Sequence, residues 1–110
     1  DTVNFYLDTL NVIGIVNINS NVPDNYSLGQ NYPNPFNPQT KIKFSVKQTS
    51  FAELKIFDIL GREVKILVNE NLKAGVYEVS FNALSLPSGV YFYRLTAADF
   101  TQTKKMVLIK

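Results

Sequence analysis

The sequence contains neither cysteine nor histidine among its 110 residues. Without cysteine there is no disulfide framework, and without either residue the usual zinc ligands and the commonest general base are missing. The nine carboxylates form no EF-hand loop, and no Gly-x-Ser-x-Gly elbow, phosphate loop or dinucleotide fingerprint occurs. We therefore expect no catalytic residue, no metal site, no cofactor and no small-molecule substrate.

Charge of one sign and long apolar runs are also scarce. Eleven basic and nine acidic residues leave a formal charge of +2 spread along the chain, which is too weak a field to indicate nucleic-acid binding. The longest apolar runs, such as residues 12–16, are far shorter than the roughly 20 residues that span a bilayer. With 45% apolar residues, the composition is that of a globular domain with one core.

What is present is a repeated alternation of apolar and polar residues. It begins at Thr40 and returns over residues 52–57, 62–68, 76–81, 90–95 and 100–109, with turn-forming residues between the segments. About seven short strands near ten residues apart predict an all-β antiparallel sandwich. Its predicted core includes Ile42, Phe44, Leu54, Ile56, Val79, Phe81, Phe92 and Leu95.

The chain divides into three parts by composition. Residues 1–18 are rich in β-branched and aromatic residues and read as the tail or closing strand of a preceding module. Residues 19–25 are mostly turn-forming residues and show no regular spacing of apolar side chains. This predicts an exposed linker that proteases can reach. Residues 26–110 form the main domain.

A proline-rich segment opens the main domain. Three prolines between Tyr32 and Pro38 remove backbone donors and exclude the helical region, so the segment cannot take a central place in a sheet. Phe36 is the one side chain able to anchor it in apolar surface. We predict a rigid clasp on the sandwich rather than a ligand site.

Other prominent residues have ordinary structural explanations. Asp58 and Arg62 are suited to an exposed ion pair across a hairpin turn. The aromatic run Tyr91–Tyr93 fits a core strand better than a sugar-stacking platform. Lysines beside the last strand keep a sheet edge from aggregating.

Several motifs in fixed order nevertheless carry a family resemblance. The motifs are Asn31–Pro38, Asp58 with Gly61–Val64, Ala74–Gly75, Ser88–Leu95 and Thr103–Lys110. Together they resemble the type A C-terminal sorting domain of the bacterial type IX secretion system, from about Tyr26 to Lys110.

The resemblance implies an immunoglobulin-like sandwich, related to that of flagellar hook-capping proteins, that acts as a non-catalytic export signal. A covalently linked upstream cargo would fold in the periplasm and be recognised through this domain by the outer-membrane type IX translocon. A sortase-like peptidase of that system typically then removes the domain. The cargo would be secreted or attached to the cell surface.

The resemblance also carries roles onto particular positions. Recognition would fall to Gly61, Arg62, Lys104, Lys105, Met106, Val107, Leu108, Ile109 and Lys110, and the structural motif would be Pro33, Asn34, Pro35, Phe36, Asn37, Pro38 and Gly89. By alternation, Met106 and Leu108 should pack inward while Lys105, Val107 and Ile109 face out. We expect the final residues to offer a free sheet edge to a receptor strand.

Two other functions stay open at this point. A carbohydrate- or surface-binding module of a multidomain extracellular enzyme would need Tyr77, Tyr91 or Tyr93 exposed in one row. A structural spacer, or an assembly domain like a hook cap, would not need a free basic C-terminal strand.

Overall fold

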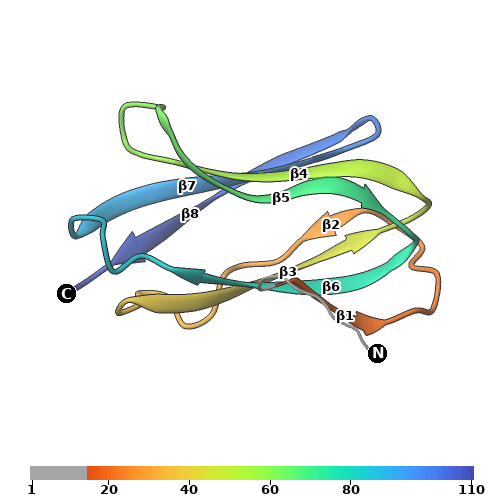
Figure 1. Cartoon of the computed structure of the whole chain (residues 1–110), viewed down its shortest axis with the longest axis horizontal. Helices are drawn as coiled ribbons and strands as arrows, with labels where there is room; N and C mark the ends of the chain where they lie inside the picture. Colours follow the sequence, from red (N-terminus) through yellow and green to blue (C-terminus); the bar gives the residue numbers. More distant parts are fainter. Residues whose placement is uncertain (1–14) are drawn as a thin grey trace.

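The computed structural model of the chain describes residues 15–110 and shows two four-stranded antiparallel sheets packed face to face (Figure 1). One sheet has the strand order β1-β6-β3-β2 and the other β5-β4-β7-β8. The strands are β1 (Ile15–Asn19), β2 (Ser27–Leu28), β3 (Gln39–Val46), β4 (Ser50–Phe57), β5 (Glu63–Leu72), β6 (Gly75–Asn82), β7 (Gly89–Ala97) and β8 (Phe100–Leu108). The predicted all-β sandwich is confirmed, with eight strands in the described part of the chain.

The order in which the chain visits the two sheets is that of an immunoglobulin-like sandwich. Hairpins join β4 to β5 and β7 to β8 within one sheet, while the connections from β3 to β4, β5 to β6 and β6 to β7 cross between the sheets. Tyr91, near the start of β7, donates a hydrogen bond from its hydroxyl to the Pro87 carbonyl four residues upstream, at 2.7 Å. This is the tyrosine corner of such sandwiches.

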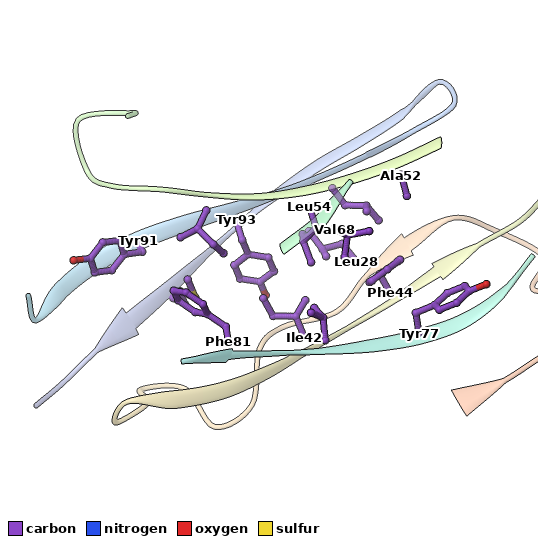
Figure 2. Close-up of a cluster of buried hydrophobic side chains, with 14 of the residues drawn as sticks. Leu28, Ile42, Phe44, Ala52, Leu54, Val68, Tyr77, Phe81, Tyr91 and Tyr93 are labelled. Carbon is purple, nitrogen blue, oxygen red and sulfur yellow. The ribbon is translucent and has the colours of Figure 1, made fainter. Parts of the chain in front are cut away.

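Alternation fills the space between the sheets with apolar side chains. Residues of β3 and β6 point toward residues of β4 and β7 across the sandwich (Figure 2). Seven of the eight predicted core residues are buried, namely Ile42, Phe44, Leu54, Ile56, Val79, Phe81 and Leu95. Burying these side chains is the main stabilising contribution to the fold.

Phe92 was wrongly predicted to be a core residue. The buried residues of β7 are Tyr91, Tyr93 and Leu95, so Phe92 lies on the outer face and is only partly buried. It pairs there with Phe57, over whose ring the Arg94 guanidinium lies at 4.5 Å. Because successive strand residues face opposite ways, Phe92 and Leu95 cannot share a face. Because β7 has aromatic residues on both faces, the sequence did not show which face is buried.

The tyrosines required by the carbohydrate-binding alternative are core residues. Tyr77, Tyr91 and Tyr93 are all buried. Their hydroxyls donate hydrogen bonds to the backbone carbonyls of Lys73, Pro87 and Gly29, at 2.7 to 2.8 Å. They therefore present no exposed row for stacking on a sugar.

The start of the described chain adds an edge strand. β1 pairs antiparallel with β6, from Ile15 opposite Val79 to Asn19 opposite Val76. The segment 20–25 that follows contains no strand and is mostly exposed. The predicted division at residues 18 and 25 stays a prediction, and residues 1–14 lie outside the described residues. No helix long and apolar enough to cross a membrane occurs between residues 15 and 110.

Candidate functional site

Four segments singled out in the sequence meet at one end of the sandwich, where the C-terminus lies in Figure 1. We call it the motif end. Phe36 bridges to Leu108, and Lys110 donates hydrogen bonds from its backbone N–H to Ser88 Oγ and from Nζ to the Leu84 carbonyl. The motif end comprises residues 30–38, 58–62, 84–89 and 105–110. These two hydrogen bonds hold Lys110 against the loop before β7.

The proline-rich segment binds the last strand, as a clasp. Phe36 is 1% exposed, and its ring lies 6.0 Å from that of Phe81. The Phe36 N–H donates to the Val107 carbonyl and the Phe36 carbonyl accepts from the Ile109 N–H, both at 2.9 Å. We call residues 32–38 the clasp, because they hold the outer edge of β8.

Side chains near the clasp complete this contact. Asn34 Oδ1 accepts a hydrogen bond from the Val107 N–H at 3.0 Å, and Gln30 Nε2 donates to the Lys105 carbonyl at 2.9 Å. The prediction that the final residues offer a free sheet edge is therefore wrong over Val107 and Ile109. The clasp already occupies the backbone groups that a receptor strand would need.

A buried polar network ties the clasp to the core. Asn31 and Thr40 are both buried, and both donate to the Pro33 carbonyl, at 3.1 and 2.9 Å, while Asn31 Nδ2 also donates to Thr40 Oγ1. The Asn31 N–H donates to the Tyr93 hydroxyl at 2.8 Å. Burial raises the pKa of Tyr93 to about 12. Because Asn31 and Tyr93 are 62 residues apart, no local pattern indicated this contact.

The last strand presents different residues on its two faces. Met106 and Leu108 are buried, as predicted, while Lys105 and Ile109 are exposed and Val107 is half-buried. Lys104, opposite Tyr93 in the register, lies on the core-facing side and is half-buried. Lys104 and Lys105 are therefore not equivalent, because only Lys105 is exposed.

The turn between β4 and β5 is held by its own hydrogen bonds. Asp58 Oδ1 accepts from the N–H groups of Leu60 and Arg62 at 2.9 Å, and Asp58 Oδ2 accepts from Arg62 Nε at 2.8 Å. The hydrogen bond from the Arg62 N–H is the main cause of the lowered pKa of Asp58. Gly61 has a φ of +83°, which favours glycine. The predicted exposed ion pair is confirmed.

A groove of about 460 Å³ runs between this turn and the loop before β7. We call it the turn groove; its lining includes Ile59, Leu60, Arg62, Leu86, Pro87, Gly89 and Val90. Ile59 and Leu60 are 69% and 73% exposed. The sequence placed them in a turn and gave no reason to assign them to a groove. Two large aliphatic residues in a turn between amphipathic strands are nevertheless a signal of an exposed apolar surface.

The residues that the sequence predicted for recognition divide between the motif end and the core. Within residues 15–110, no three His, Cys, Asp or Glu side chains gather where they could hold a metal ion. Gly61, Arg62, Gly89, Lys105, Ile109 and Lys110 lie at this end, whereas Met106 and Leu108 are in the core. The surface there is apolar with cationic residues.

Comparison with protein families gives a match over most of the chain. Residues 30–110 match the model of the family described as secretion system C-terminal sorting domain. The matched range contains the whole motif end and strands β3 to β8. A search of the curated proteins found no match to the chain.

Proposed function

The chain belongs to the family of secretion system C-terminal sorting domains and is a C-terminal sorting signal for type IX secretion, and we propose that its motif end is the surface the translocon reads. The family is in general non-catalytic, and it implies a secreted or cell-surface protein that interacts with the type IX machinery. We further propose that this chain contributes no catalysis of its own.

The convergence of the family-matched segments is the observation that supports this proposal. The clasp, the β4–β5 turn, the loop before β7 and the last residues are far apart in sequence but share one end. A stable core does not require exposed aliphatic residues such as Leu60 or Ile109 there. Such residues suit a receptor-binding surface, because burial of apolar surface is the dominant favourable term in most protein–protein association.

The proposed route has two further steps. The attached cargo crosses the periplasm with this domain folded, and the outer-membrane translocon then selects it through the exposed residues Arg62, Lys105, Ile109 and Lys110. A sortase-like peptidase afterwards cleaves between β1 and β2, and the cargo reaches the cell surface. The mostly exposed segment 20–25, which contains no strand, suits such a cut.

An export assay tests the proposal. The whole chain is fused behind a periplasmic reporter enzyme in a bacterium with a type IX system, and in the same strain without its outer-membrane translocon. We expect reporter activity outside the cell only in the first strain. Reporter retained in the periplasm of both strains, or released equally by both, would overturn the proposal.

A further inference from the structure

Two large aliphatic side chains at the motif end are not used by the fold. Ile59 and Leu60 form the tip of the β4–β5 turn and are 69% and 73% exposed. The turn does not depend on them, because its hydrogen bonds run through Asp58 and the backbone of Leu60, Gly61 and Arg62. Contiguous exposed apolar surface that the fold does not need marks a candidate binding surface.

The floor of the turn groove has a backbone position without a ladder partner. β4 pairs with β7 as far as Phe57 opposite Phe92, so the next hydrogen-bonded position of the ladder would place Ile59 opposite Val90. The chain has already turned there. The backbone groups of Val107 and Ile109 bond to the clasp, so those of Met106 and Leu108 point toward β7. In β7 the backbone groups of Gly89 and Tyr91 therefore point toward β8. The N–H and C=O of Val90, which lies between them, face the β4 side. β4 offers them no partner.

The Arg62 guanidinium lies at the rim of the groove. Asp58 and Arg62 are the charged residues in its lining. The Asp58 carboxylate is already engaged by three hydrogen bonds. The Arg62 side chain is 72% exposed, and its Nε donates to Asp58 Oδ2. Its two terminal NH₂ groups take no part in this ion pair. A carboxylate on a partner would complement this guanidinium.

A larger hollow elsewhere is less informative. It measures about 680 Å³ and is lined by Tyr32, Lys41, Lys65 and residues 80–82. Neither the β4–β5 turn nor the loop before β7 contributes to its lining.

We propose that the turn groove binds an extended segment of a translocon protein that carries aliphatic side chains and one carboxylate. The segment would add a backbone contact at Val90, pack its aliphatic side chains against Ile59, Leu60 and Leu86, and pair its carboxylate with Arg62. This assignment rests on the proposed function. It goes further in naming the chemistry of the partner and the place where it binds.

Export of the reporter fusion gives the first test. Ile59→Ser with Leu60→Ser, and separately Arg62→Glu, should each reduce export about tenfold or more. Matched controls are Val22→Ser, which is 70% exposed in the 20–25 segment, and Lys73→Glu, an exposed lysine between β5 and β6. Both controls should be exported normally. The unfolding temperature of the groove variants should shift by no more than about 3 °C.

Crosslinking in cells identifies the protein that occupies the groove. It does not require that the substitutions leave the fold unchanged. A photoreactive benzoylphenylalanine at position 60 of the otherwise unchanged fusion should form an adduct with an outer-membrane component of the type IX system. The crosslinked peptide should contain an Asp or Glu beside aliphatic residues. The same probe at position 22 should not give this adduct.

The outcomes separate the two proposals. Failure of the unchanged fusion to be exported overturns the proposed function. If that fusion and the controls are exported and the groove variants are exported equally well, only the groove assignment is overturned. An adduct at position 60 with a second copy of the fusion, or with lipid alone, also overturns it.

Discussion

The clasp and the β4–β5 turn lie at the same end of the sandwich but are built in opposite ways. Phe36 of the clasp is 1% exposed, whereas Leu60 of the turn is 73% exposed. The clasp bonds to a strand 73 residues away, at Val107, while the hydrogen bonds of Asp58 reach no further than four residues. The first segment closes the fold and the second presents side chains. Residues in the motifs of one family can therefore contribute either to stability or to recognition. The burial of each side chain distinguishes the two roles.

The largest expected effect is the loss of the clasp anchor. Phe36→Ala should lower the free energy of unfolding by about 3–5 kcal/mol, because it removes a fully buried ring from between β8 and Phe81. Urea denaturation measures this. Tyr32→Ala in the same clasp is the control, and its exposed ring should make little difference. A cost below about 1 kcal/mol for Phe36→Ala would show that the clasp is not structural.

Burial of Tyr93 beneath the clasp should make the fold sensitive to alkali. The folded protein holds the Tyr93 proton up to a pKa of about 12, against the ordinary value of 10.0. Below pH 10 this contribution is fully present, and it is lost as pH rises toward 12, by on the order of 2 kcal/mol. Denaturation at pH 9 and pH 11.5 checks it. The drop should be smaller in Tyr93→Phe, which cannot ionise; equal drops would contradict the account.

The turn should tolerate substitution better than the clasp. Gly61→Ala should cost about 1 kcal/mol, because alanine is strained at a φ of +83° although open space surrounds the position of its Cβ. Thermal unfolding of the variant measures the difference. A loss above about 3 kcal/mol would mean that the turn is coupled to the core, and the comparison would fail.

The smallest effect concerns the Asp58 carboxylate. Its pKa should lie below 3.8, so that the stability it contributes is present above that value and is lost as pH falls through the lowered pKa. The Arg62 backbone N–H is the main cause, so Arg62→Gln should leave most of the lowering in place. A carbon-detected NMR titration of the carboxyl resolves this. A return to 3.8 in the variant would assign the effect to the guanidinium instead.

Local pattern predicted most of the fold but only part of the motif end. Alternation located the strands, and proline chemistry with a single aromatic identified the clasp and its anchor Phe36. It could not show that the clasp would occupy the edge of β8 at Val107, because that contact joins residues distant in sequence. It also could not fix the phase of β7, where Phe92 and Tyr93 are both aromatic. The turn groove arises from two loops brought together only by folding.

The most direct measurement compares export with unfolding temperature in one set of fusions: unchanged, Phe36→Ala, and Ile59→Ser with Leu60→Ser. The account predicts that the turn variant unfolds like the unchanged chain but is not exported. Phe36→Ala should unfold at a lower temperature and be exported again when cells grow below that temperature. If export in all three fusions simply followed the unfolding temperature, the division between a clasp that holds and a turn that is read would be contradicted.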